Sequence, residues 1–170
     1  MDAVHDTELA TVESVDLKRY LGTWYEVARL PFRHEDRGAR NVTAQYSLNE
    51  DGTIRVINRN INEQGEAEEA VGEAKPVDAT NSKLKVSFLP EGLRWVPFAK
   101  GDYWILRLDP DYTTSLVGTP DRKYLWLLSR TPVMQEEKRN DWLEFARSKG
   151  FDISKIIITP QTEEEFPSAK

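Results

Sequence analysis

Cysteine is absent from this 170-residue chain. Its absence excludes disulfides, thiolate nucleophiles, cysteine-ligated zinc, iron–sulfur clusters and lipid attachment through a thiol. No apolar run reaches the roughly 18 residues that read as a membrane-spanning helix. Excess positive charge is also missing: 23 Lys and Arg stand against 29 Asp and Glu, a formal net charge of -6. An acidic chain is a poor partner for nucleic-acid phosphates, so we expect no nucleic-acid binding.

The N-terminal residues lack the basic and apolar regions of a secretory signal. We therefore expect either a cytosolic protein or one whose leader has been removed. The length fits one domain, and 39% hydrophobic residues with Trp 5, Tyr 6 and Phe 6 supply a core. We expect a flexible arm over 1–14, one domain over 15–160 and a solvated acidic tail over 161–170.

Short segments of strand character follow one another between these ends. Alternating or apolar runs are separated by turn signals such as Asp51-Gly52 and Gln64-Gly65. Eight strands at this spacing predict an all-β barrel or sandwich. The runs cover residues 22–30, 41–48, 53–61, 66–77, 83–88, 102–108, 113–118 and 123–130.

One helix and one further short strand follow the eight strands. Thr131 is the expected N-cap, Pro132 the expected first helical residue and Gly150 the stop signal. A last strand is expected over 153–159. One helix cannot cover both faces of a sandwich, so we expect it to pack outside a closed barrel. The residues that can share its buried face are Met134, Trp142, Phe145 and Ala146.

Three sequence signals coincide along the chain: GTWYE at 22–26, LDPDY at 108–112 and YLWLLSRTP at 124–132. With these motifs the chain resembles the lipocalin family over roughly residues 15–160. The resemblance is nearest to the branch of bacterial lipocalins and apolipoprotein D. It implies an eight-stranded antiparallel up-and-down barrel, with one C-terminal α-helix packed outside and a short ninth strand.

The first and eighth strands of such a barrel meet at the same end. Trp24 and Arg130 should therefore lie together beside Gly22, with the guanidinium over the indole face. A desolvated cation–π pair of this kind contributes about 2 kcal/mol. We expect these residues to close the barrel floor and to perform no chemistry.

Small and apolar side chains are expected on the inner face of the barrel, where Ala70 and Gly72 would leave space. An apolar lining with a few polar groups is typical of a small-molecule site, although the same residues could fill a packed core. Resemblance to apolipoprotein D places Tyr46, Asn58 and Trp126 in the pocket. The remaining residues expected to line it are Ala28, Ala44, Val56, Leu84, Val86, Phe88, Tyr124 and Leu128.

The resemblance implies binding, storage or transport of a small hydrophobic ligand, such as a fatty acid or lysophospholipid. It also implies a role in cell-envelope lipid maintenance, at the periplasm or outer membrane, with no cofactor.

The sequence leaves the orientation of two side chains open. Glu26 faces inward or outward, with Arg130 as one candidate partner, and in strand 102–108 either Tyr103 or Trp104 faces inward. Nothing in the sequence specifies a monomer or a dimer.

Basic and aromatic residues gather in the two segments expected at the barrel mouth. Cations beside exposed aromatics suit a membrane surface, and the same side chains could instead cap the pocket. The segment 31–40 carries Arg33, His34, Arg37 and Arg40, and the segment 89–101 carries Arg94, Trp95, Phe98 and Lys100.

An enzyme is the main competing class of protein. The sequence shows no Ser–His–Asp arrangement, phosphate-binding glycine loop or cluster of metal ligands, so we expect neither catalysis nor a metal site. Two more classes stay open: a haem-binding protein that uses His34, and a structural protein with a filled barrel.

Overall fold

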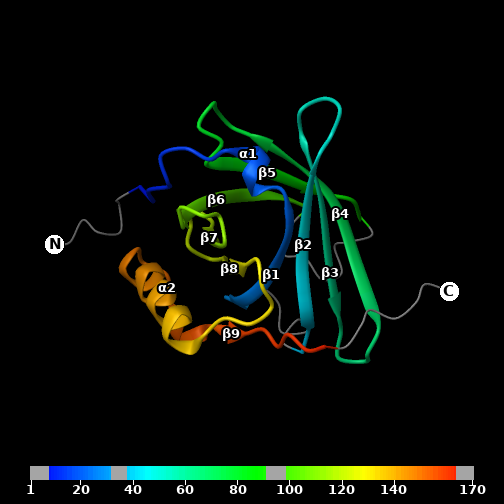
Figure 1. The fold of residues 1–170 in the computed structure, drawn as a ribbon, viewed down its shortest axis with the longest axis vertical. Helices are drawn as coiled ribbons and strands as arrows, with labels where there is room; N and C mark the ends of the chain where they lie inside the picture. Colours follow the sequence, from blue (N-terminus) through cyan, green and yellow to red (C-terminus); the bar gives the residue numbers. More distant parts are fainter. Residues whose placement is uncertain (1–7, 32–37, 91–98, 164–170) are drawn as a thin grey trace.

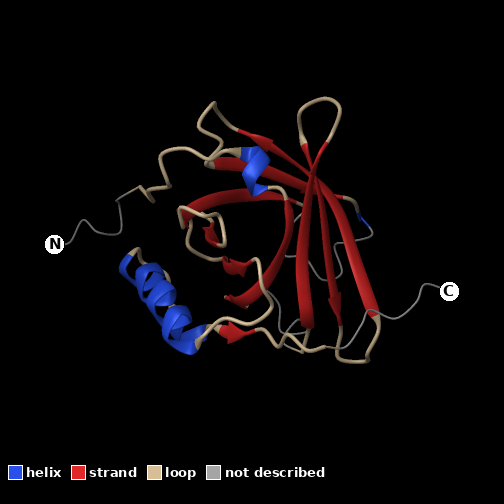
Figure 2. Ribbon diagram, viewed as in Figure 1, coloured by secondary structure: helices blue, strands red, loops and turns tan. Residues whose placement is uncertain are grey.

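A computed structural model describes residues 8–31, 38–90 and 99–163. Eight antiparallel strands close into a barrel because β1 pairs with both β2 and β8 (Figures 1 and 2). The predicted fold is therefore confirmed. The strands are β1 (Gly22–Arg29), β2 (Arg40–Leu48), β3 (Ile54–Ile61), β4 (Ala67–Pro76), β5 (Lys83–Phe88), β6 (Lys100–Leu108), β7 (Thr114–Gly118), β8 (Leu125–Ser129) and the outer β9 (Ile157–Ile158).

Tight turns join the strands where the sequence predicts them. Gly52 and Gly65 both have positive φ, at 90° and 82°, which glycine adopts without steric cost. The Asp51 carboxylate accepts hydrogen bonds from the backbone N–H and the hydroxyl of Thr53. These contacts fix the β2–β3 hairpin and thereby the register of β3.

Helix α2 (Glu136–Ser148) lies outside the barrel (Figure 1). Trp142, Leu143 and Ala146 bury their side chains against apolar residues of the barrel, including Leu116 and Leu127. The predicted helix position is confirmed, but its predicted start is wrong. Thr131 hydrogen-bonds the carbonyl of Val133 and caps no helix; Gln135 occupies the N-cap position.

A second, four-residue helix, α1 (Leu17–Tyr20), was not predicted and lies at the end of the barrel where β1 begins (Figure 1). The segment before it also differs from the loose arm that we expected over residues 1–14. Leu9 is buried under α2, and the Val12 N–H donates to the Ile105 carbonyl. Apolar side chains at these positions dock the segment onto the barrel.

Register shifts interrupt the strand pairing in three places, in β1, in β6 and between Arg40 and Thr43 of β2. A register shift in β1 between Glu26 and Ala28 puts Ala28 in the cluster between barrel and helix. A second shift lies in β6 between Ile105 and Arg107. In β6 Tyr103 faces the interior and Trp104 the outside, which settles the orientation that the sequence left open.

The last segment predicted as a strand, 153–159, is mostly irregular. It begins with a 3-10 turn, Ile153–Lys155, and only Ile157–Ile158 pair with β1 as β9. The chain then crosses toward β2, where the Pro160 carbonyl accepts from the Asn41 N–H. The segment Ile157–Thr162, here called the C-terminal strap, thus links β1 and β2 at the end of the barrel opposite α1.

Candidate functional site

The barrel encloses a cavity with a mostly apolar wall. The centres of water molecules can occupy about 100 Å³ of it, several times the roughly 10–15 Å³ that one water requires. The barrel is therefore hollow. The lining side chains are Leu17, Tyr20, Glu26, Arg29, Val42, Thr43, Ala44, Tyr46, Ile54, Val56, Asn58, Asn60, Ala74, Leu84, Val86, Phe88, Tyr103, Trp126 and Leu128.

One end of the barrel is closed by Trp24 and Arg130. The Arg130 guanidinium lies 3.9 Å from the centroid of the fully buried Trp24 ring. Its nitrogens donate to the carbonyls of Arg19, Thr23 and Tyr112 at 2.7, 3.2 and 3.1 Å. Gly22 leaves room for this group, because a Cβ there would lie 3.1 Å from Arg130 Nη1. Arg130 thereby holds α1, β1 and the loop between β6 and β7 together.

Three phenols meet in the closed half of the cavity. The Tyr103 hydroxyl is hydrogen-bonded to those of Tyr20 and Tyr46, each at 2.8 Å, and the Tyr20 hydroxyl to Ser115 Oγ at 2.7 Å. Burial raises the pKa of Tyr20 to about 12 and also raises the pKa of Tyr46 and Tyr103. The phenols thus stay neutral and serve as hydrogen-bonding groups near neutral pH.

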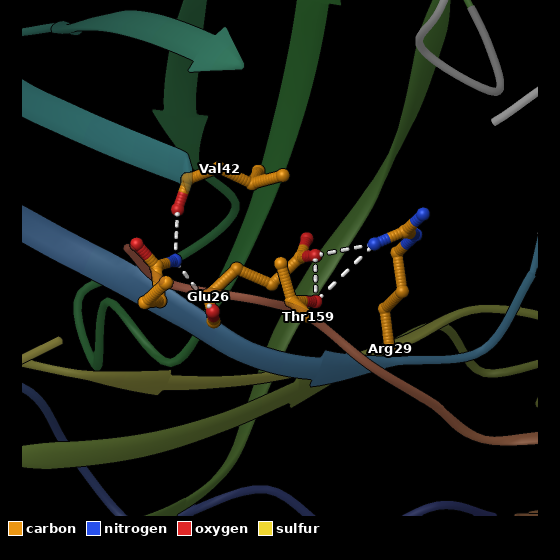
Figure 3. Close-up of polar contacts among 5 residues, drawn as sticks. Glu26, Arg29, Val42 and Thr159 are labelled. Atoms are coloured by element: carbon orange, nitrogen blue, oxygen red, sulfur yellow. Dashed lines mark hydrogen bonds and ion pairs between the residues drawn. The ribbon is translucent and has the colours of Figure 1, made fainter. Parts of the chain in front are cut away.

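A buried ion pair lies in the half of the cavity opposite α1 (Figure 3). Arg29 Nη1 donates to Glu26 Oε2 at 2.8 Å, and the side chains are 1% and 6% exposed. The Thr159 hydroxyl donates to the same carboxylate oxygen at 2.6 Å and accepts from Arg29 at 3.2 Å. Glu26 therefore faces inward, with Arg29 and not Arg130 as its partner.

The C-terminal strap covers a gap beside this pair, where the pairing of β1 with β2 stops after Tyr25. The Gln161 side-chain amide donates to the carbonyls of Glu26 and Val42 at 2.9 and 3.0 Å, so it bridges the two strands (Figure 3). The strap and the barrel wall together enclose the side of the cavity beside the ion pair.

Most residues expected to line the pocket contact the cavity, and four do not. Ala28 packs under α2 because of the bulge in β1. Ala70 is buried but does not reach the cavity, and the space at Gly72 is filled by Ser87 O and the Phe88 ring. Tyr124 stacks on Trp126, with ring centroids 6.2 Å apart. The expected residues that do line the cavity are Ala44, Tyr46, Val56, Asn58, Leu84, Val86, Phe88, Trp126 and Leu128.

Several polar lining residues escaped the sequence analysis. Asn60 continues the inward alternation of Val56 and Asn58, so that pattern could have found it. Arg29 could not be found this way, because the bulge reverses the facing of the residues that follow it. The expected mouth residues Arg33, Trp95 and Phe98, and His34 with them, lie outside the described residues.

No group of three or more potential metal ligands occurs within residues 8–31, 38–90 and 99–163. In the same part of the chain, no helix is long and apolar enough to cross a membrane. The cavity offers hydrogen bonds and apolar contact, which suit reversible binding of a small molecule.

Comparison with known proteins agrees with this geometry. Residues 15–161 match the family model of the lipocalin-like domain. The chain is 44% identical to outer membrane lipoprotein Blc of Escherichia coli K12 over 155 residues, 90% of this chain and 83% of that protein. It is 33% identical to mouse apolipoprotein D over 156 residues, 88% and 78% of the two chains. Among solved structures, insecticyanin of the tobacco hornworm superposes with a TM-score of 0.69 at 19% identity, covering 92% and 86%.

Proposed function

The chain belongs to the lipocalin family, on its bacterial and apolipoprotein D-like branch, and we propose that its barrel binds, stores or transports a single-chain lipid. Family membership supports the binding of small hydrophobic ligands in general. A fatty acid or a lysophospholipid is the ligand that we propose for this chain. We propose that the chain is a binding protein and not an enzyme.

The hollow interior is the observation that carries this proposal. A barrel built only as a structural unit would fill its centre with side chains, whereas this one leaves space between Val56, Val86 and Leu128. Burial of an acyl chain there gains about 25 cal/mol for each Å² of apolar surface, before the costs of association.

Three residues have proposed roles in holding the lipid. Trp126 provides a broad apolar surface, kept in place by the Tyr124 ring stacked against it. Asn58 and Tyr46 offer hydrogen bonds to polar atoms of the ligand. The Tyr46 hydroxyl is already bonded to Tyr103 and can take part in a further bond.

We further propose that the protein acts in lipid maintenance at the cell envelope, in the periplasm or at the outer membrane. The support is its similarity to outer membrane lipoprotein Blc. Contact of the barrel mouth with a membrane surface through Arg33, Trp95 and Phe98 stays a prediction from the sequence. Flotation with vesicles tests it, and equal absence of binding with and without anionic lipid would contradict it.

Titration of the purified chain with a fatty acid and with a lysophospholipid, followed by tryptophan fluorescence, tests the proposed function. We expect saturable binding, weakened about tenfold or more by Trp126→Ala, since a buried aromatic contributes about 1.5–3 kcal/mol. Trp104→Ala is the matched control, because that indole lies on the outer face of β6. Absence of saturable binding by both lipids would overturn the proposal.

A further inference from the structure

Asn60 on β3 is the least satisfied polar side chain of the cavity wall. Its residue is 1% exposed, and it lines the cavity. Neither Oδ1 nor Nδ2 has a hydrogen-bond partner among the described residues. The assignment of oxygen and nitrogen does not affect this observation, because both atoms lack partners.

Buried amides in folded proteins almost always have hydrogen-bond partners, since an unsatisfied polar group loses its bonds to water without compensation. Asn60 neighbours Glu68 across the β3–β4 ladder, but the Glu68 carboxylate accepts from Asn62 and not from Asn60. An unpaired amide facing a cavity is thus available to an occupant. It offers that occupant one acceptor and two donor hydrogens.

The charges nearby restrict which head group can enter. Arg29, Glu26 and Asn60 all line the half of the cavity near the β1–β2 connection, because Arg29 ends β1 and Asn60 precedes the end of β3. The Glu26 carboxylate neutralises the Arg29 guanidinium at 2.8 Å, and Thr159 adds a third contact. A free carboxylate placed there would lose hydration and gain no net positive charge from this pair in return, because Glu26 already neutralises Arg29.

We propose that Asn60 recognises an uncharged pair of hydrogen-bonding groups on the ligand: the ester carbonyl and the neighbouring hydroxyl of an acylglycerol. Monoacylglycerols and lysophospholipids share this chemistry, and free fatty acids lack it. The proposal rests on the proposed lipid-binding function and narrows it. Asn60 is a specificity residue that selects the acylglycerol backbone over a free carboxylate.

A series of lipids with the same twelve-carbon chain tests this proposal. Monolauroylglycerol, methyl laurate, laurate and lauroyl lysophosphatidylcholine are titrated into the full chain, followed by tryptophan fluorescence. We expect monolauroylglycerol to bind about tenfold more tightly than laurate or methyl laurate, corresponding to about 1.4 kcal/mol. The lysophospholipid identifies the source of the backbone: tighter binding than that of monolauroylglycerol points to phospholipids, weaker binding points to neutral acylglycerols, and equal binding shows that only the shared backbone is recognised.

The variant Asn60→Leu separates recognition from a structural role. We expect it to lower the affinity for monolauroylglycerol about tenfold, to lower that for methyl laurate, which keeps only the ester carbonyl, by a smaller factor, and to raise the urea midpoint of the ligand-free protein. The midpoint rises because an unsatisfied buried amide is removed. Arg59 lies on the outer face of the same strand, in an exposed ion pair with Glu69. Arg59→Leu should therefore leave the preference for monolauroylglycerol over laurate unchanged.

Equal affinity for the whole series, or tightest binding of laurate, would overturn the selection by Asn60 while leaving the lipid-binding function intact. A lower urea midpoint of Asn60→Leu with an unchanged preference would also overturn it. Absence of saturable binding by every lipid would instead overturn the proposed function itself.

Discussion

At the scale of single residues, the closed half of the cavity depends on a chain of four hydroxyl groups. Tyr46, Tyr103, Tyr20 and Ser115 are linked in that order by three hydrogen bonds. Four hydroxyl protons serve three links, so one proton is left for another acceptor. If all three hydrogen bonds run from Ser115 toward Tyr46, the remaining proton belongs to Tyr46, which lines the cavity.

The phenols predict how stability depends on alkaline pH. Burial raises the pKa of Tyr20 from 10.0 to about 12, and it raises the pKa of Tyr46 and Tyr103 in the same direction. The unfolded chain therefore releases these protons first, and the free energy of unfolding falls as pH rises from about 10 to about 12. Over this pH range, the free energy of unfolding of Tyr46→Phe, measured in urea, should fall by about 1 kcal/mol or more less than that of the unmodified protein. The same dependence of stability on pH in the variant and in the unmodified protein would contradict this prediction.

At the scale of elements, the C-terminal strap completes a wall that the strands leave unfinished. Thr159 and Gln161 reach from the strap to the Glu26 carboxylate and the Glu26 and Val42 carbonyls. The strap thus supports the buried ion pair from outside the sheet. Removing one bond to a buried charge leaves that charge less well solvated.

The variant Thr159→Val keeps the shape of the side chain and removes its hydroxyl. We expect it to lower the free energy of unfolding by about 1–3 kcal/mol, because it removes a hydrogen bond to a buried carboxylate. Thr23→Val is the control, since Thr23 is exposed near the start of β1 and the loss of its hydroxyl should cost about 0.5 kcal/mol or less. Equal effects of the two variants in urea unfolding would show that the strap does not support the ion pair.

The elements also show how far the sequence predicts this molecule. Period-two alternation, apolar runs and turn residues located all eight strands, because most strands have one buried and one exposed face, and β7 and β8 are buried on both. The bulge at Glu26 could not be predicted, since an extra residue in β1 depends on how β8 and β9 pair with it. That bulge moved Ala28 out of the expected lining and brought Arg29 in. The strap was missed for a related reason: its contacts join residues more than 100 positions apart.

At the scale of the whole molecule, one closed sheet separates two apolar clusters. One cluster lies between the barrel and α2 and contains Trp142 and Leu127, and the other surrounds the cavity and contains Trp24 and Val56. The outer cluster anchors α2 to the barrel. The inner cluster can therefore leave a hollow without loss of the fold, and we propose that one lipid molecule occupies this hollow.

Native mass spectrometry of the full chain with monolauroylglycerol and lauroyl lysophosphatidylcholine tests this claim most directly. Ala44 lines the cavity and Gln45, next to it on β2, is exposed on the outer face. We predict one bound lipid per chain for the unmodified protein and for Gln45→Phe, and none for Ala44→Phe, whose ring would fill the cavity. Equal lipid binding by the two variants, both folded by circular dichroism, would show that the lipid binds outside the barrel and would contradict the account.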